Sequence, residues 1–387
     1  MTNLDSEVNY PPLIVTSEMG THGETGVQTH FNDFVDYVRT RSRRVEFVGP
    51  DEAQNSYNHL RVTNGVLTRL TRVNKRFAYS RMRSLTFYAT KAELRRRLNG
   101  LAAWCVYAQD PTTARAAVSL RRLPSHRVIL AVHYNVSQSE EMANRGIVRR
   151  GDRLYQRIIA EEKATLQAVD KVIVFSKFMR DQLVSRIGVS CGFVVIPNTA
   201  QPSAPIASVT PRDLITIGSL EPRKNQEFLL RVLAEARRRG RVYSLTLVGS
   251  GEDRERLESL ASTLGVASHT HFMGRQYNAA SLLSAHKLLV HGALVENLPI
   301  TLIESLAAGV PILAPNVGGI PEIFDDGIEG RFWMSQDVGA SASILIELME
   351  DDAMRMRMSL AAKERYKSRF NRTQIFQSLS KVIYGEI

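Results

Sequence analysis

The sequence has few cysteines and no long apolar run. No segment approaches the ~20 apolar residues of a membrane-spanning helix. The first residues, MTNLDSEVNYPP, lack the basic and then apolar layout of a secretion signal. Cys105 and Cys191 lie in apolar stretches without metal-ligand spacing, so we expect both to be reduced core residues. No paired acidic metal motif occurs either. We therefore expect a cytoplasmic protein that needs no metal or cofactor.

The positive charge is concentrated in one half of the chain. The 387 residues suffice for about two domains, and the formal net charge is +11. Residues 1–200 contain 29 Lys and Arg against 18 Asp and Glu, whereas residues 201–387 contain 21 of each. Because the whole excess lies in residues 1–200, we expect this half to meet an anionic surface or substrate.

Short apolar segments alternate with helical patterns along the chain. This alternation predicts an α/β protein with parallel sheets wrapped by helices. A stretch rich in Pro, Ser and Ala, residues 198–210, is typical of an interdomain linker. The predicted strands are 13–15, 45–48, 102–108, 128–132, 171–175, 193–196, 214–217, 244–248, 271–273, 288–291 and 311–314. The predicted helices are 27–37, 152–169, 226–237, 254–264, 279–286, 302–308 and the tail 351–384.

Residues 61–97 are strongly basic, with apolar residues interleaved. Such a segment suits helices whose basic face lies on anionic lipid. An ordinary solvated helix face explains the pattern as well. Nucleic acid is not expected, because no nucleic-acid fold signature accompanies the charge. The basic residues are Arg61, Arg69, Arg72, Lys75, Arg76, Arg81, Arg83, Lys91, Arg95, Arg96 and Arg97, against Glu93 alone.

Two features of the first half lie at predicted strand ends. Glycines at positions 20, 23 and 26 separate the first strand from the helix 27–37, so backbone can approach a ligand there. His133 directly follows the strand 128–132, and open α/β sheets bind ligands at the carboxyl ends of their strands. A plain turn and a structural histidine are the ordinary explanations.

Two adjacent cations, Arg223 and Lys224, follow the strand 214–217 in the segment Gly218-Ser-Leu-Glu-Pro-Arg-Lys-Asn-Gln. Cations are disfavoured beside a helix N-terminus, so this position indicates an anion such as a diphosphate. Gly249 ends the strand 244–248, and Gly274 and Arg275 follow the strand 271–273 in the same way.

The stretch 291–322 combines two carboxylates with a helix start. Glu296 precedes the helix and Glu304 lies about one turn inside it, so both can bracket one polyhydroxylated ligand. The unpaired N–H groups of a helix start can hold a phosphate. An acidic helix start followed by an ordinary turn remains the alternative for this stretch taken alone.

Taken together, these motifs resemble family-4 retaining glycosyltransferases of GT-B fold, particularly mannosyltransferase-like members. The resemblance covers essentially the whole chain and is tightest over residues 213–333. Glu296 and Glu304 match the E-x7-E signature within ENLPITLIESLAAGVPILA, and VGGIPEI follows it. The segment from Gly218 to Gln226, VIVFSKFM, VIPN and GETGVQTHF also fit. The resemblance implies two Rossmann-like domains facing each other across a cleft. These would be residues 1–200, joined by the C-terminal helix 368–387, for the acceptor, and residues 201–367 for the donor.

The resemblance also implies a role for each matched residue. Arg223 and Lys224 would hold the donor diphosphate, Glu296 would face the transferred sugar, and Glu304 would bind the ribose. His133 would contact sugar and phosphate. Two departures, Ser219 in place of a usual Arg and Asn297 in place of a usual Gly, leave the donor open. The remaining implied donor contacts are Gly26, Gly218, Gly249, Gly274, Arg275, Asn297, Leu298, Pro299, Ile300, Thr301 and Leu302.

The expected activity is retaining transfer of a hexose, foremost mannose from GDP-mannose, to a saccharide acceptor. We expect a lipid-linked acceptor at the inner face of the cytoplasmic membrane, in polysaccharide or glycolipid synthesis. A UDP-sugar with a soluble small acceptor is the first alternative. A non-catalytic protein that binds sugar nucleotides or polyanions is the second.

Overall fold

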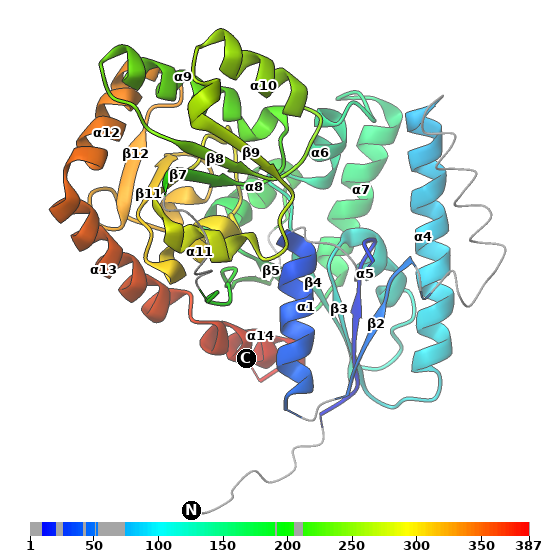
Figure 1. The fold of residues 1–387 in the computed structure, drawn as a ribbon. Helices are drawn as coiled ribbons and strands as arrows, with labels where there is room; N and C mark the ends of the chain where they lie inside the picture. Colours follow the sequence, from blue (N-terminus) through cyan, green and yellow to red (C-terminus); the bar gives the residue numbers. More distant parts are fainter. Residues whose placement is uncertain are drawn as a thin grey trace, which may run out of the picture. The chain divides into compact units, whose positions relative to one another are not determined.

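The computed structural model describes residues 10–20, 26–41, 44–50, 52, 74–189, 192–204 and 212–386. Cys191, Gly23, Arg61, Arg69 and Arg72 lie outside these residues, as does the second half of the linker. The chain divides into two compact units. Unit 1 comprises residues 1–196 and 376–387, and unit 2 comprises residues 197–375. Each unit is an α/β structure with one parallel sheet (Figure 1).

Unit 1 is built on six parallel strands in the order β2-β1-β3-β4-β5-β6. The order reverses direction between β1 and β3, which makes their carboxyl ends the topological switch point of this sheet. Ile14, Val106 and Leu130 contribute to its core. The strands are β1 Leu13–Thr16, β2 Val45–Val48, β3 Trp104–Ala108, β4 His126–Val132, β5 Lys171–Val174 and β6 Phe193–Val195. The helices are α1 Gly26–Arg39, α4 Lys75–Leu98, α5 Pro111–Val118, α6 Gln138–Asn144, α7 Arg153–Ala168, α8 Lys177–Ile187 and most of α14 Arg372–Tyr384.

Unit 2 has six parallel strands in the order β12-β11-β10-β7-β8-β9. Here the order reverses between β7 and β10, which pair with Leu214 opposite Leu288. This is the strand order of a Rossmann fold, in which ligands bind beyond the strand ends at the reversal. The strands are β7 Arg212–Ile217, β8 Leu245–Val248, β9 Thr270–Gly274, β10 His286–Val290, β11 Ile312–Pro315 and β12 Gly330–Trp333. The α-helices are α9 Gln226–Arg238, α10 Arg254–Thr263, α11 Ile300–Ala308, α12 Val338–Glu350 and α13 Asp352–Arg369.

The predicted fold class is confirmed, and two of the predicted helices need correction. The segment Ala279–Ala285 is a 3-10 helix, and His286 already belongs to β10, where it pairs with Arg212. The tail is two helices, because α13 ends at Arg369 with Phe370 as its C-cap and Asn371 caps the start of α14. Its side chain accepts a hydrogen bond from the backbone N–H of Gln374 at 3.2 Å, as a helix-capping asparagine does.

Among the described residues, no helix is long and apolar enough to cross a membrane. Cys105 is fully buried in β3, as predicted for a core cysteine. Burial raises the pKa of its thiol to about 12, so the side chain stays uncharged.

Candidate functional site

Arg223, Lys224 and Glu296 meet at the switch point of unit 2. Arg223 and Lys224 lie in the 3-10 turn Pro222–Lys224 beyond β7, and Glu296 lies in the loop beyond β10. Lys224 Nζ donates to Glu296 Oε1 at 2.5 Å, and Arg223 Nη1 lies 3.2 Å from the same oxygen. Two cations therefore converge on one carboxylate oxygen at the place where Rossmann sheets bind ligands.

The two loops that carry these side chains are tied together by hydrogen bonds. Leu294 N donates to Arg223 O at 2.9 Å, and Arg223 Nη1 donates to Val295 O at 3.2 Å. Asn225 has left-handed backbone at φ 51° and donates from Nδ2 to Gly292 O. A Cβ on Gly292 would lie 2.7 Å from Asn225 O, so this close approach requires glycine. The cations and the carboxylate are thus held by backbone contacts as well as by their ion pairs.

A glycine turn supports Glu296 from the other side. Gly319 N donates to Glu296 O at 2.9 Å. Gly318 has a φ of +59°, and a Cβ added there would lie 2.0 Å from Glu296 O. A side chain at position 318 would displace the backbone that carries Glu296.

The electrostatics keep Glu296 charged and His291 neutral. Burial alone would raise the pKa of Glu296, but Lys224, His291 and Arg223 outweigh it and hold the pKa well below its usual range. Burial lowers the pKa of His291, although Glu296 acts in the opposite direction. His291 Nε2 lies 3.4 Å from Glu296 Oε1 without hydrogen-bond geometry. The site at neutral pH is therefore an ionised carboxylate between two cations and a neutral imidazole.

These cations retain capacity for an anion. An ammonium group has three donors, and Glu296 Oε1 takes one of those of Lys224. Arg223 also pairs with Glu221 through Nη2 at 2.6 Å, and both side chains are about one-third exposed. A charged ligand can compete for such partly exposed pairs, because they are only partly desolvated.

Helix α11 begins directly after this loop. Pro299 is its N-cap residue and makes no side-chain capping hydrogen bond, and the first helical residue is Ile300. The N–H groups of a helix's first turn have no partner within the helix, and they carry the positive end of its dipole. Asn297 and Leu298 are buried, and Glu304 lies half-buried one turn into the helix.

The other predicted glycines connect neighbouring strand ends of unit 2. A Cβ on Gly249 would lie 1.9 Å from Gly218 O, so the loops after β7 and β8 are in contact. Gly249 N donates to Gly274 O at 2.9 Å, which joins the loop after β8 to the end of β9, just before Arg275. The carboxyl ends of β10, β7, β8 and β9 form a continuous row. These four adjacent strands are separated by three interstrand spacings, so the row is about 14 Å long.

His133 and Gly26 belong to unit 1, whereas all other predicted site residues belong to unit 2. His133 follows β4, is partly exposed, and binds Gln109 Oε1 through Nε2 at 2.9 Å. Gly26 is the first residue of α1. The structure therefore divides the predicted site residues between the two units.

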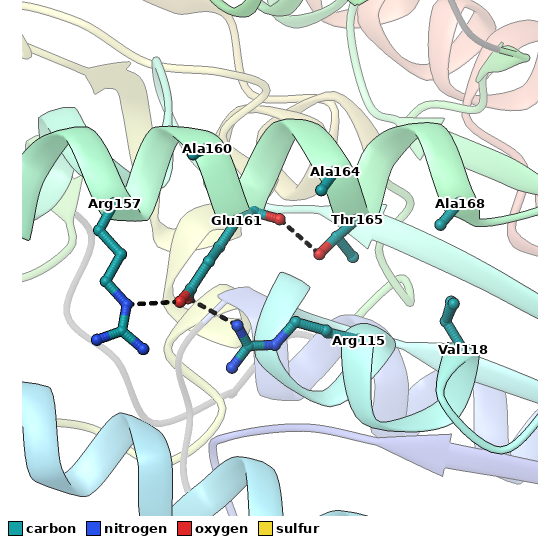
Figure 2. Close-up of a pocket in the computed structure, with 8 residues that line it drawn as sticks. All are labelled: Arg115, Val118, Arg157, Ala160, Glu161, Ala164, Thr165 and Ala168. Carbon is teal, nitrogen blue, oxygen red and sulfur yellow. Dashed lines mark hydrogen bonds and ion pairs between the residues drawn. The ribbon is translucent and has the colours of Figure 1, made fainter.

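A separate cavity of about 470 Å³ lies between α5 and α7 of unit 1 (Figure 2). Arg115 and Arg157 both bind the carboxylate of Glu161 at its edge, at 2.9 and 2.8 Å. The rest of its lining is Val118, Ala160, Ala164, Thr165 and Ala168. It contains none of the predicted site residues. Within the described part of the chain, no group of three His, Cys, Asp or Glu is arranged to hold a metal ion.

Sequence reasoning missed several residues of these sites. His291 directly follows β10, as His133 follows β4, so its position at a strand end was a usable signal. Gln109 directly follows β3 and so carried the same signal, although its contact with His133 depends on one side-chain direction. Asn225 gave no such signal, because its contact with Gly292 joins segments that are distant in the sequence. His30 was also missed. It lies on the buried face of α1, and its Nε2 is 3.0 Å from the hydroxyl of Tyr107.

Comparison with known protein families supports these observations. Residues 199–365 match the family described as "Glycosyl transferases group 1". Residues 25–203 match the family described as "Glycosyltransferase Family 4". The first match contains all six strands of unit 2, and the second contains β2 to β6 of unit 1.

Curated relatives include a Mycolicibacterium smegmatis protein named GDP-mannose-dependent alpha-(1-6)-phosphatidylinositol monomannoside mannosyltransferase. It is 34% identical over 160 residues, which are 39% of this chain and 42% of the relative. The N-acetyl-alpha-D-glucosaminyl L-malate synthase of Bacillus anthracis is 29% identical over 140 residues, 36% of this chain and 37% of the relative. The chain thus spans less than half the length of these curated relatives.

Solved structures with the same fold cover nearly the whole chain. Anabaena HepE, in complex with UDP and glucose, has a TM-score of 0.71 and 14% identity, covering 97% of this chain and 100% of that one. The glycosyltransferase WaaG has a TM-score of 0.69 and 17% identity, and the match covers 96% of this chain and 99% of that one. At these identities the likeness concerns the fold. The likeness shows the GT-B fold, and the two family matches show that the chain belongs to the family-4 glycosyltransferases of this fold.

Proposed function

We propose that this chain is a retaining glycosyltransferase that moves a hexose from a nucleotide-diphosphate sugar to a saccharide acceptor. The observation that carries the proposal is the convergence of Arg223 and Lys224 on Glu296 at the switch point of unit 2. A glycosidase would need two carboxylates in acid and base roles, whereas here the buried carboxylate is held ionised by cations.

In the proposed reaction, Lys224 and Arg223 bind the diphosphate and stabilise the negative charge that grows on it. The first-turn amides of α11 at Ile300 and Thr301 cap the same group, whereas the Leu302 N–H donates to Pro299 O at 3.2 Å. The bond from the anomeric carbon to the phosphate oxygen breaks while the acceptor oxygen bonds to that carbon on the same face. The departing phosphate oxygen takes the acceptor's proton. Preorganised donors of this kind are each worth about 10²–10³ in rate.

The remaining donor contacts follow the row of strand ends. Glu296 and the loop from Asn297 to Pro299 face the transferred sugar, and Glu304 binds the ribose. Gly218 and Gly249 allow the backbone to approach the phosphates, while Gly274 and Arg275 hold the base. From unit 1, His133 contacts the sugar, and Gly26 contributes the start of α1. Unit 2, residues 197–375, is the donor unit, and unit 1, residues 1–196 with 376–387, is the acceptor unit.

For the donor we propose GDP-mannose, which the names of relatives at 31–34% identity specify for those proteins. The test is a calorimetric binding panel of GDP-, UDP- and ADP-sugars, followed by transfer assays. Tightest binding of GDP-mannose supports the proposal. Tightest binding of a UDP-sugar would show that the donor is a UDP-sugar and not GDP-mannose. Binding without hydrolysis or transfer to any acceptor would favour a non-catalytic sugar-nucleotide-binding protein.

For the acceptor we propose a lipid-linked saccharide at an anionic membrane surface. The support is a stripe on α4 formed by Phe77, Arg81, Tyr88 and Arg95. All four are exposed, and Arg81 lies over the Phe77 ring at 5.3 Å. Their spacing of four, seven and seven residues puts them on one helix face. Basic and aromatic side chains on one face suit the interface of an anionic bilayer.

A second candidate is a GT-B enzyme with a small soluble acceptor. The relative from Bacillus anthracis supports it, because the name of that protein specifies L-malate as the molecule glycosylated. Product analysis with soluble against polyprenyl-linked acceptors separates the two candidates.

A further inference from the structure

The His133 ring is held on three sides within unit 1. Its Nε2 lies 2.9 Å from Gln109 Oε1. The Phe175 ring packs against it at 4.7 Å between centroids, and the His30 ring meets it edge-on at 5.5 Å. Among the described residues, none forms a hydrogen bond with the other ring nitrogen, Nδ1. Since His133 is partly exposed, Nδ1 is the ring atom left for a ligand.

Gln109 is itself fixed at the switch point of unit 1. It follows β3, is 3% exposed, and its backbone N–H donates to Thr16 O at the end of β1 at 2.8 Å. Turning the amide away would also remove the partner of Oε1, and a buried polar atom without a hydrogen bond costs about 1–3 kcal/mol. The amide Nε2 of Gln109 already has no such partner among the described residues.

Among the residues that the structure describes, no charged group faces the ring. The polar groups around it are Gln109, His30 and the Tyr107 hydroxyl, and that hydroxyl is bonded to His30. Burial, and then His30, lower the pKa of His133 well below its ordinary value, so the imidazole is neutral. A neutral imidazole has one N–H donor and one lone-pair acceptor.

We propose that Gln109 is a positioning residue that fixes His133 as the Nε2–H tautomer, so that Nδ1 accepts a hydrogen bond from a hydroxyl of the bound sugar. The amide oxygen of Gln109 only accepts, so Nε2 must carry the proton. A ring in this state cannot donate to a phosphate through Nδ1. His133 therefore recognises a sugar hydroxyl and leaves the diphosphate to other groups. This inference rests on the proposed sugar transfer for its role in turnover, but the tautomer itself does not.

The first test reads the tautomer without activity. In ¹⁵N-histidine NMR spectra, assigned by loss of signal in His133→Asn, His133 should show a protonated Nε2 and an unprotonated Nδ1 from pH 5.5 to 8. Gln109→Leu should mix the two tautomers. Gln138→Leu, a change at another buried glutamine of unit 1, should not. A proton on Nδ1 in the wild-type protein would overturn the inference.

The second test uses the pH profile of kcat/KM. Gln109→Glu keeps an acceptor on Nε2–H, but its negative charge raises the pKa of His133. As the pH falls, Nδ1 becomes protonated and ceases to accept, so this variant should gain an acid limb and recover activity at high pH. In Gln109→Leu, kcat/KM should fall at least about tenfold at every pH, which corresponds roughly to the loss of one hydrogen bond. Equal, pH-independent losses in both variants would contradict the positioning role.

The two tests separate the inference from the proposed function. If the wild-type protein transfers no sugar from any donor while NMR shows the Nε2–H tautomer, the proposed function fails and the tautomer assignment stands. If transfer occurs with the other tautomer, only this inference fails.

Discussion

Lys224 and Glu296 are 72 residues apart in the sequence and form a 2.5 Å ion pair between the loops that follow β7 and β10. The pair lies where the strand order of unit 2 reverses, and both side chains are largely buried, at 16% and 7% exposure. A largely buried lysine beside a carboxylate costs desolvation energy that a purely structural role does not need. This cost is understandable if the pair opens to receive a diphosphate.

Replacing Lys224 by Ala should lower kcat about 10²–10³-fold and weaken nucleoside diphosphate binding, because one preorganised cation is lost. Transfer assays and calorimetry measure both effects. Lys287→Ala is the matched control, since Lys287 pairs with Asp213 at the opposite end of the sheet of unit 2. Unchanged transfer by the Lys224 variant would show that the diphosphate site has been assigned wrongly.

Gly318→Ala should destabilise the protein and weaken donor binding, because its Cβ would collide with the backbone oxygen of Glu296. Gly327→Ala is the control. It has a similar positive φ of +79°, yet nothing lies within 4 Å of its added Cβ. Gly327→Ala should lower the free energy of unfolding by about 1–2 kcal/mol, because alanine is strained in left-handed backbone, and it should leave donor affinity unchanged. Thermal unfolding and calorimetry provide the comparison, and equal donor affinities in both variants would argue against support of Glu296 by this turn.

Glu162→Gln should make the protein more stable than wild type at pH 8 but not at pH 4.5. Glu162 is fully buried, and burial raises its pKa to about 7. Since the folded pKa exceeds the unfolded value of about 4.3, wild-type stability falls as the pH rises between these values. The neutral variant lacks this loss of stability. At pH 8 its free energy of unfolding, measured by urea denaturation, should exceed that of the wild type by an amount on the order of 1–3 kcal/mol.

The neighbouring Glu161 supplies a control of opposite sign. Burial alone would raise its pKa, but Arg83, Arg157 and Arg115 lower it. Its contribution is therefore present above about pH 4.3 and is lost as the pH falls. Glu161→Gln should destabilise the protein at pH 8 and have less effect at pH 4.5. If both variants changed stability in the same direction at pH 8, the assigned charge states would be incorrect.

Reversing the charge of the α4 stripe, with Arg81→Glu and Arg95→Glu together, should reduce binding to anionic liposomes at least about tenfold. Each basic residue near such a surface contributes about 1 kcal/mol. Flotation at low salt measures the effect, with Arg357→Glu on the exposed face of α13 as control. Absence of wild-type binding at low salt would refute the membrane proposal.

Much of the fold could be predicted because its strands are local apolar runs. Segments such as 45–48 and 128–132 have little alternative to strand, and their alternation with helices implies a parallel sheet. Arg223 and Lys224 could be found because cations are unusual beside a helix start. The break at Asn371 was missed because asparagine also occurs inside helices, and its capping role depends on where its side chain bonds.

The contacts that support the site were less predictable. Gly318 acts on Glu296 through a backbone approach, and Gln109 acts on His133 through one side-chain hydrogen bond. Such relations depend on where folded loops meet, and a residue's type and its sequence neighbours do not encode this. Sequence patterns therefore locate the charged groups of the site more readily than the residues that aim them.

The return of the chain to unit 1 makes unit 2 an internal insertion. Phe376, Leu379 and Ile383 of α14 are buried in unit 1, and Arg127 Nε donates to Ile383 O at 3.2 Å. A gene cut at residue 196 would leave unit 1 without these core side chains. Chimaeras that exchange donor specificity between relatives should therefore swap residues 197–375 as a cassette with two junctions, and keep both ends of the host chain.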